Sequence, residues 1–266
     1  MWWLPLAEKH KKFLAGEEVV IIMGRGHSGT RVMTRICECL GVNVGATGEL
    51  KTGDTTDLKF TRTIKKVATH DIDCNFTNER KSWLQNRFDR AVSKYYQGLD
   101  SREVWGWKFP ETYLIGPYVR DTFPKARYIH LLRDGRDLAF KKHLTDDPNR
   151  KLGKVLLSHL GAMDKPHHIQ AALSWEYQVN AWAAFAETLP EGSVIDFRFE
   201  DILRTPRESV AQLTEFLGLE MTEACDEFLT NELDTSKARQ HRENDPKQVS
   251  EVIDVIGDSL KAYGYI

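Results

Sequence analysis

The stretch Val19–Arg31, VVIIMGRGHSGTR, decides the fold of this chain, because a short apolar run leads through glycines into a helix. Residues 19–23 are typical of a buried parallel strand, and Gly24 and Gly29 allow the backbone to turn its N–H groups toward one point. The helix that we expect over residues 30–40 directs the positive end of its dipole at the same point. The segment therefore predicts a phosphate-binding loop between a strand and a helix.

This loop departs from the P-loop of ATP-binding enzymes at two positions. The glycines fit the G-x-x-x-x-G frame, but Thr30 and Arg31 stand where a Lys and then a Ser or Thr are expected. That Lys reaches the β- and γ-phosphates and the hydroxyl after it holds Mg²⁺, so this chain suits MgATP poorly. The Thr30 hydroxyl and the cations Arg25, His27 and Arg31 can still contact an anion, each charge-assisted bond contributing roughly 1.5–3 kcal/mol. A glycine-rich turn that binds no ligand is the structural alternative.

Composition limits the classes of protein to consider. A chain of 266 residues with 41% hydrophobic and 29% charged residues predicts one domain spanning residues 1–266. The net charge of -2 argues against a nucleic-acid partner. Neither a zinc site nor a disulfide framework is indicated by the spacing of Cys37, Cys39, Cys74 and Cys225. We find no run of membrane-spanning length and no signal-peptide pattern, and therefore expect a cytoplasmic protein, although a truncated domain of the secretory pathway would have the same features.

Strand and helix patterns alternate along the chain. This alternation predicts an α/β protein with a P-loop-NTPase-like three-layer fold, in which helices flank a central parallel sheet. Residues 41–57 and 145–166 are expected to be irregular, the first as a loop at the ligand edge of the sheet and the second as a lid. The expected strands are 19–23, 104–108, 126–132 and 193–197, and the expected helices are 30–40, 83–96, 112–123, 133–144, 168–188, 202–217, 223–230 and 249–263.

Two further segments give the loop a more specific meaning. They are Phe123–Lys141, FPKARYIHLLRDGRDLAFK, and Phe197–Glu220, FRFEDILRTPRESVAQLTEFLGLE. Together with HSGTR at residues 27–31 they resemble, in order, the three-part signature of sulfotransferases that depend on 3′-phosphoadenosine 5′-phosphosulfate (PAPS). The motifs are most similar to those of bacterial, glycan and protein-tyrosine sulfotransferases. HSGTR resembles the loop that binds the 5′-phosphosulfate, and the second segment resembles the strand, turn and helix that bind the 3′-phosphate.

The resemblance implies PAPS as the donor and a set of residues that bind it. Arg133 is also indicated by its own position, because it directly follows a buried strand at the ligand edge of a parallel sheet; a solvated charge cluster at a helix start is the alternative. The chain departs from the family pattern at His27, Lys141 and Phe199, where the family has a Lys or Arg, a Ser and a Tyr. The candidate donor-binding residues are Arg25, Gly26, His27, Ser28, Gly29, Thr30, Arg31, Arg133, Lys141, Phe199, Arg239 and Arg242.

Sulfuryl transfer also requires a base for the acceptor proton and positive charge on the departing phosphate. The glycan and protein-tyrosine enzymes that this chain resembles carry a glutamate about two dozen residues after the loop, which implies Glu49 as the base. Asp54, Asp57 and His70 are the alternatives. Lys108, in WGWKFP, resembles a lysine that reaches the active site of glycan sulfotransferases, and with His27 it would offset charge on the leaving side.

The sequence thus predicts a metal-independent sulfotransferase that moves a sulfuryl group from PAPS to a hydroxyl or amine of a small-molecule or glycan acceptor. Two other functions remain open at this point. One is a P-loop kinase that uses ATP, and the other is a nucleotide-binding protein that keeps the fold without turnover. The sequence leaves the acceptor and the oligomeric state undetermined.

Overall fold

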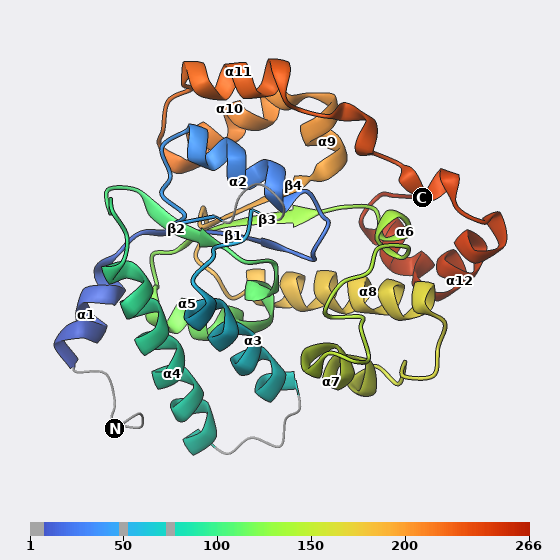
Figure 1. Ribbon diagram of the computed structural model, residues 1–266, viewed down its shortest axis with the longest axis horizontal. Coiled ribbons are helices and arrows are strands. Elements are labelled where there is room, and N and C mark those ends of the chain that lie inside the picture. The colour runs from blue at the N-terminus through green and yellow to red at the C-terminus, as the bar shows by residue number, and fades with distance from the viewer. Residues whose placement is uncertain (1–7, 48–52, 73–77) are drawn as a thin grey trace.

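A parallel sheet of four strands forms the centre of the protein, as the sequence predicts (Figure 1). The computed structural model describes residues 8–47, 53–72 and 78–266. The strands are ordered β2-β1-β3-β4, so the first strand of the chain lies inside the sheet. Their bounds are β1 Val19–Gly24, β2 Trp105–Lys108, β3 Arg127–Leu132 and β4 Val194–Arg198.

The strand register brings the carboxyl ends of the strands to one edge. Ile22 of β1 pairs with Lys108 of β2 on one side and with Ile129 of β3 on the other, and Leu132 of β3 pairs with Arg198 of β4. In open parallel sheets, ligands bind beyond this edge. The glycine-rich loop, Lys108 and Arg133 all follow or end these strands and therefore lie on the same side of the molecule.

The alternation of side chains along β1 builds two cores on opposite faces of the sheet. Ile21 packs into a core with Trp105 and Trp107, and Ile22 packs into a second core with Ile36 and Phe197. The first face is covered by α1 Glu8–Gly16, α3 Leu58–Ile72, α4 Asn78–Gln97, η1 Pro110–Ile115, α5 Gly116–Thr122 and α8 His167–Ala186. The second is covered by α2 Thr30–Cys39, α9 Phe199–Arg204, α10 Pro206–Leu217 and α11 Glu223–Asn231.

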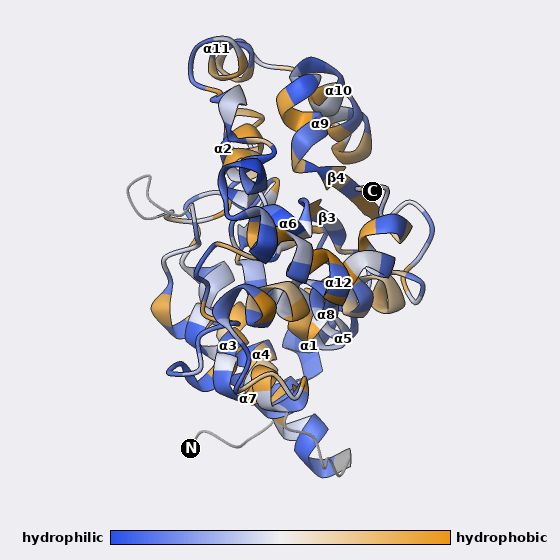
Figure 2. Cartoon of the chain, turned by 90° about the vertical axis from the view of Figure 1, so that its right-hand side faces the viewer, coloured by the Kyte–Doolittle hydropathy of each residue, from blue (hydrophilic) through white to orange (hydrophobic). Residues whose placement is uncertain are grey.

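A third, smaller core lies beyond the end of β3. Leu138 of α6, Gly135–Leu138, packs there with Trp175 of α8 and Ile256 of α12, Pro246–Ala262. Figure 2 views this side of the molecule, where α6 lies between the layer of α2, α9 and α10 and the layer of α3, α4 and α7, Lys151–His159. Among the described residues, none of the helices combines the length and apolar character needed to cross a bilayer.

The structure differs from the sequence expectations in how several helices begin and end. The helix expected over 133–144 ends at Leu138, because the following residues run back toward the glycine-rich loop and make contacts there. The segment 145–166, expected to be irregular, contains the helix α7, Lys151–His159, whose Leu156 and Leu157 are buried. The pattern over 202–217 is two helices, with Pro206 beginning the second. The sequence analysis did not foresee α1 or α3.

A substitution at Gly106 tests the close packing of β2 against β1. A Cβ atom at this position would overlap the carbonyl oxygen of Val20, so we expect Gly106→Ala to lower the free energy of unfolding by about 1–3 kcal/mol. Gly16 is the matched control, because a Cβ there meets no atom within 4 Å, and Gly16→Ala should leave stability unchanged or raise it by up to about 1 kcal/mol. Urea denaturation of both variants measures the difference. Equal stability of Gly106→Ala and the unmodified protein would contradict the strand packing described.

Candidate active site

The glycine-rich loop joins β1 to α2 through two residues with left-handed backbone conformation. His27 has φ 71° and Gly29 has φ 88°, and the Ser28 N–H donates to the Arg25 carbonyl at 3.1 Å. A non-glycine residue in this region of φ carries a backbone cost of order 1 kcal/mol, and such residues concentrate at ligand clamps. The turn ends where α2 begins, and within the described residues no side chain caps the N-terminus of α2 at Gly29. Its first N–H groups therefore suit an anion.

Two observations show that this loop fits a phosphate-like group. The Ser28 hydroxyl is buried, and its oxygen has no hydrogen-bond partner within the described part of the chain. A Cβ atom at Gly26 would overlap the ring of His143, and one at Gly29 would overlap the ring of Phe199. The loop is therefore closed on both sides by aromatic rings and presents an unsatisfied hydroxyl, as expected for a cradle around an oxyanion.

His27 links the loop to the segment after α6. Its Nε2 lies 3.0 Å from the carbonyl oxygen of Lys142. His27 is exposed overall, but partial burial of its ring lowers its pKa. The hydrogen bond to the Lys142 carbonyl opposes this effect, and the nearby side chains of His143, Arg25 and Lys141 lower the pKa further. Burial and the neighbouring side chains thus disfavour the charged form of His27.

Arg25 occupies a different place from the other loop residues. Its side chain is completely buried and forms an ion pair with Asp146. Burial lowers the pKa of Arg25, and the Asp146 carboxylate opposes that effect. Because breaking a buried ion pair is costly, this pair anchors the loop to the segment after α6. The guanidinium therefore lies beneath the loop, and contact of Arg25 with a phosphate stays a prediction.

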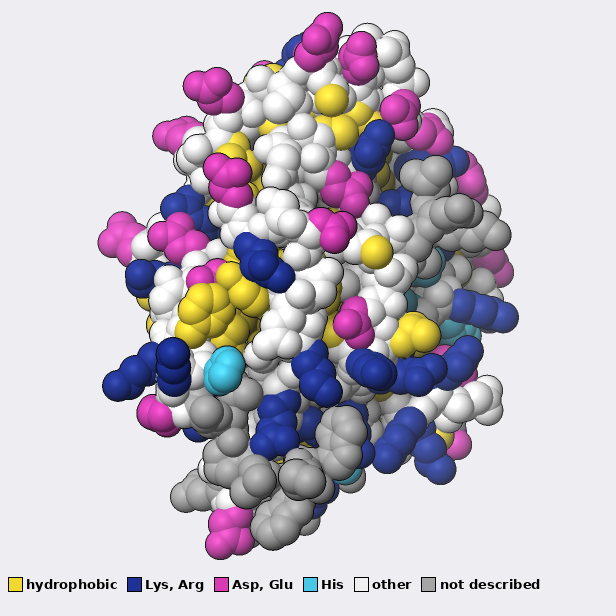
Figure 3. All heavy atoms as spheres, turned by 60° about the vertical axis from the view of Figure 1, so that its left-hand side comes forward, with side chains coloured by type: hydrophobic (Ala, Val, Ile, Leu, Met, Phe, Trp, Pro, Cys, Tyr) yellow, Lys and Arg dark blue, Asp and Glu magenta, His cyan; other side chains and the backbone are white. Residues whose placement is uncertain are grey.

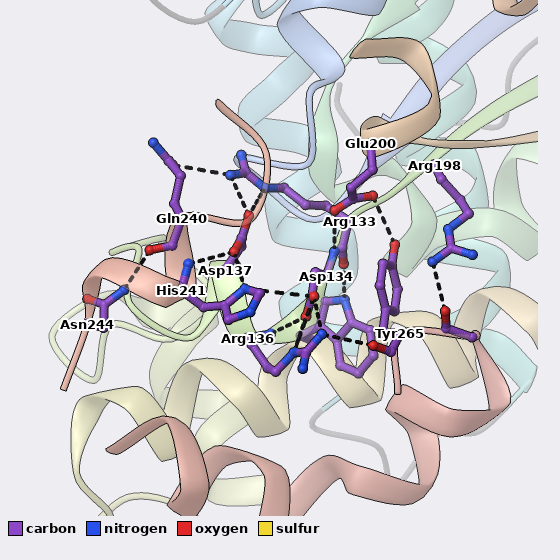
Figure 4. Close-up of polar contacts among 12 residues, drawn as sticks. Arg133, Asp134, Arg136, Asp137, Arg198, Glu200, Gln240, His241, Asn244 and Tyr265 are labelled. Carbon is purple, nitrogen blue, oxygen red and sulfur yellow. Dashed lines mark hydrogen bonds and ion pairs between the residues drawn. The ribbon is translucent and has the colours of Figure 1, made fainter. Parts of the chain in front are cut away.

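Arg133 connects three segments that are far apart in the sequence. Its guanidinium donates to the His27 carbonyl at 3.1 Å, to the Lys237 carbonyl at 2.7 Å and to the Asp137 carboxylate at 2.9 Å. It also lies 4.7 Å from the centre of the Phe199 ring, at cation–π distance. Figure 4 shows Arg133 beside Asp137, with Gln240 on the tail. The guanidinium therefore lies where the loop, the RDGRD turn and the tail meet.

The tail is fixed to this turn by hydrogen bonds that the sequence analysis missed (Figure 4). Asp137 accepts from the backbone N–H of His241 at 2.8 Å and lies 2.7 Å from its Nδ1. Glu200 accepts from the Asp134 N–H at 3.0 Å and from the Tyr265 hydroxyl at 3.3 Å. The alternating charges of RDGRD indicated that this turn forms polar contacts. The sequence could not identify the partners, because they lie more than sixty residues away along the chain.

Lys108 ends β2 with its side chain buried. Its ammonium group forms an ion pair with Asp54, and burial lowers the pKa of Lys108 while Asp54 opposes the shift. The backbone of Thr55 pairs with Lys108, since the Thr55 N–H donates to the Lys108 carbonyl at 2.9 Å. Arg31, in the first turn of α2, lies against Gly53 in the same region. The structure thus brings Lys108, Arg31 and Asp54 together at the ligand edge of the sheet.

The candidate bases are placed very differently. Glu49 lies outside the described residues. Asp57 accepts from the N–H groups of Lys59 and Phe60 at 2.8 and 2.9 Å, which makes it the cap of α3. His70 is in the last turn of the 15-residue α3, a helix ~20 Å long, and contacts Arg80 of α4. Asp54 is the candidate that the described residues place next to Lys108.

The remaining donor-binding candidates lie around the same edge. Lys141 follows α6 and lies close enough to His27 to affect its charge, but it is not on a helix as the sequence analysis expected. Arg239 and Arg242 are exposed and flank the buried His241, and Arg239 has a left-handed φ of 58°. The tail η3, Gln240–Glu243, is therefore docked against Asp137 with these two cations facing solvent.

Comparison with known proteins defines the class. The model of the sulfotransferase family matches residues 20–223, so the chain belongs to that family of sulfuryl-transferring enzymes. A sulfotransferase from Alicyclobacillus acidocaldarius matches with a TM-score of 0.56 and 16% identity over 92% of this chain and 94% of the other. The sulfotransferase domain of the Synechococcus PCC 7002 olefin synthase matches with a TM-score of 0.53 and 16% identity, over 91% of this chain and 94% of the domain. Sulfotransferase STF9 from Mycobacterium avium matches with a TM-score of 0.55 and 12% identity, over 96% of this chain and 79% of STF9. At these identities the matched structures support the shared fold. No curated protein sequence matches the chain.

Asp137 gives the network a measurable pH dependence. Burial raises the pKa of Asp137, but hydrogen bonds from His241 and Arg133 outweigh burial and lower the pKa to about 2 from an ordinary value of 3.8. Because the folded-state pKa is depressed, the stabilisation is present above pH 3.8 and is lost as the pH falls toward 2. This shift of the pKa corresponds to about 2 kcal/mol of folding free energy.

We therefore expect Asp137→Asn to be less stable than the unmodified protein at pH 7, with a difference that shrinks between about pH 4 and 2. Chemical denaturation across this pH range measures the difference. The exposed Asp258 is the matched control, and Asp258→Asn should leave the free energy of unfolding unchanged at each pH. A difference for Asp137→Asn that stays constant with pH would show that the carboxylate charge is not what matters.

Proposed function

We propose that this protein transfers the sulfuryl group of PAPS to a hydroxyl or amine of a small-molecule or glycan acceptor, without a metal ion. The observation that carries the proposal is the loop between β1 and α2. It combines an uncapped helix start, a buried Ser28 hydroxyl that lacks a partner within the described residues, and the Arg133 guanidinium bonded to the loop's own backbone. Membership of the sulfotransferase family supports the same reaction.

Each part of the donor has residues of suitable chemistry. The N–H groups of residues 26–30, with the hydroxyls of Ser28 and Thr30, would hold the 5′-phosphosulfate. Arg133 and Lys141 would hold the 3′-phosphate, and a 3′-phosphate near Arg133 would share the guanidinium with Asp137. Phe199, whose ring lies against Gly29 and Arg133, would contact the adenosine side. Arg31, Arg239 and Arg242 would add positive charge around the nucleotide.

The chemistry is an in-line exchange at sulfur. The acceptor oxygen or nitrogen forms a bond to sulfur as the bond from sulfur to the 5′-phosphate oxygen breaks, and the acceptor proton passes to a carboxylate. We propose Glu49 as that carboxylate. Lys108 would stabilise the departing phosphate, and His27 would take on charge when the dianionic phosphate forms beside it. The ion pair between Asp54 and Lys108 lies at this edge of the sheet, which supports placing the acceptor and the base there.

A kinase function has less support from the same residues. Thr30 and Arg31 occupy the positions of the P-loop lysine and the magnesium-binding hydroxyl. The two functions differ in whether binding requires Mg²⁺.

Titration calorimetry with PAP, the desulfated nucleotide, tests the donor site. We expect PAP to bind in EDTA and Arg133→Ala to weaken binding by roughly 10- to 100-fold, because a charge-assisted bond contributes about 1.5–3 kcal/mol. Arg120→Ala, at a half-exposed arginine on α5, is the matched control and should bind PAP normally. Binding of MgATP but not of PAP would reject the proposal in favour of a kinase.

The base is tested by isosteric variants. We expect Glu49→Gln to lower kcat by about 10²- to 10⁴-fold while PAP binding is unchanged, because a positioned base contributes that much to the rate. Asp57→Asn is the control, because the Asp57 carboxylate caps α3. We expect this variant to lower the stability of the protein and to leave kcat unchanged. Transfer of radiolabelled sulfate to an acceptor measures kcat. Full activity of Glu49→Gln with loss of activity in Asp54→Asn would move the role of base to Asp54.

A further inference from the structure

A buried carboxylate that the proposed reaction does not use lies close to the glycine-rich loop. Glu111, in the first turn of η1, is 1% exposed, and its Oε1 lies 3.0 Å from Nε2 of His143. No other group among the described residues donates a hydrogen bond to either of its oxygens. Because a carboxylate is costly to bury without a cation beside it, His143 determines the state of this group.

The ring of His143 is held at both nitrogens. Its Nδ1 lies 2.8 Å from the hydroxyl of Thr145, which in turn accepts from the Ser174 hydroxyl at 3.1 Å. The backbone N–H of His143 donates to Asp146 at 2.8 Å, and Thr145 and Ser174 are completely buried. Both ring nitrogens therefore face oxygen atoms, an arrangement in which a doubly protonated ring can donate to each of them.

This ring lies directly against the backbone of the loop. A Cβ atom at Gly26 would fall 2.1 Å from Cδ2 and 2.2 Å from Nε2 of His143, so a glycine is needed to leave room for the ring. The His27 ring packs edge-on against it, with 6.1 Å between the ring centres. A charge on His143 would therefore act on the N–H groups of the loop and on an anion bound there.

Charge balance in this buried cluster indicates a proton on His143. Of the two buried carboxylates, Asp146 is paired with Arg25, and Glu111 faces His143. Burial raises the pKa of Glu111, but the contact with His143 and its charge outweigh burial and lower the pKa. A charged Glu111 beside a neutral ring would leave an uncompensated negative charge next to a loop that suits an anion.

Other ionisable groups around the pair do not replace this charge. They are Arg25 and His27 on the loop, Lys65 on α3, Tyr113 on η1, Tyr177 on α8, and Lys141 and Asp146 beside His143. Burial and the charge of Glu111 raise the pKa of Tyr113, so its phenol is neutral. Lys65 also lowers the pKa of Glu111, but its effect is smaller than that of His143. His143 is therefore the main counter-charge of Glu111.

We propose that Glu111 and His143 are a positioning pair for the phosphate-binding loop, in which Glu111 keeps a proton on the His143 ring and the charged ring supports Gly26. The inference rests on the proposed function, because the charge of the ring would attract the 5′-phosphosulfate through the loop. Exposed cations, such as the Lys and Arg side chains that gather on the lower part of the face in Figure 3, are screened by salt, whereas a buried charge is screened much less. His143 would thus supply positive charge at the end of the loop where His27 replaces the Lys or Arg of the family pattern.

Nitrogen NMR of the donor-free protein, with 15N-labelled histidine, tests the pair without any nucleotide. The His143 signals are those missing from Glu111→Gln/His143→Gln. We expect both ring nitrogens of His143 to carry hydrogen at pH 7.5 in the unmodified protein and only one in Glu111→Gln, because an imidazole without a carboxylate partner is mostly neutral at that pH. A neutral His143 ring in the unmodified protein, or a charged ring in Glu111→Gln, would overturn the proposal.

Titration calorimetry with PAP tests the effect of the pair on the loop. We expect Glu111→Gln to weaken PAP binding roughly five- to tenfold at pH 7.5, with a difference that narrows toward pH 5.5 as His143 regains its proton. The matched control is Asp89→Asn, which removes a buried carboxylate on α4 that accepts from Thr122 and Gln85, and it should bind PAP normally at both pH values. A loss in Glu111→Gln that is equal at both pH values, or no loss, would overturn the assignment.

Stability measurements separate an ion pair from simple packing. His143→Gln alone leaves Glu111 charged and unpaired, so we expect a clear drop in the urea midpoint. Glu111→Gln/His143→Gln should regain most of this drop, because the double variant leaves no charge unpaired at this position. A double variant less stable than His143→Gln would overturn the ion pair. Failure of the unmodified protein to bind PAP would reject the proposed function by itself, since the NMR and stability results concern the donor-free protein.

Discussion

The site depends on one guanidinium. Arg133 follows β3 and donates to the glycine-rich loop, to Asp137 in the turn after β3 and to the tail at Lys237. The indole N–H of Trp175 donates to the Arg133 carbonyl at 2.9 Å and fixes the backbone of this residue. Because each segment supplies candidate donor-binding residues, the position of Arg133 sets their spacing.

The parallel sheet makes this arrangement possible. Its strand order places β1 between β2 and β3, so the loop after β1 has Lys108 on one side and Arg133 on the other. The buried pair of Arg25 and Asp146 then ties the loop to the segment after α6. The ring of Phe199 lies against one end of this loop, at Gly29, and the ring of His143 lies against the other, at Gly26.

Local patterns predicted the parts of the fold that short-range forces determine. The apolar runs of β1 and β3 and the glycines of the loop act within a few residues, and the four strands and their parallel sheet were predicted correctly. Among the helices that flank the sheet, α1 and α3 were not predicted. The sequence did not predict the early end of α6, the burial of Arg25 or the partners of Asp137. These features depend on contacts with residues about a hundred positions away.

The central claim is that the loop and Arg133 bind the two phosphate ends of a PAPS-type nucleotide without a metal. A crystal structure of the protein with PAP, grown in EDTA, tests this most directly. We predict the 5′-phosphate within hydrogen-bond distance of the N–H groups of residues 26–30 and the 3′-phosphate within hydrogen-bond distance of Arg133. A nucleotide bound elsewhere, or with its 3′-phosphate away from Arg133 and the loop empty, would contradict the account.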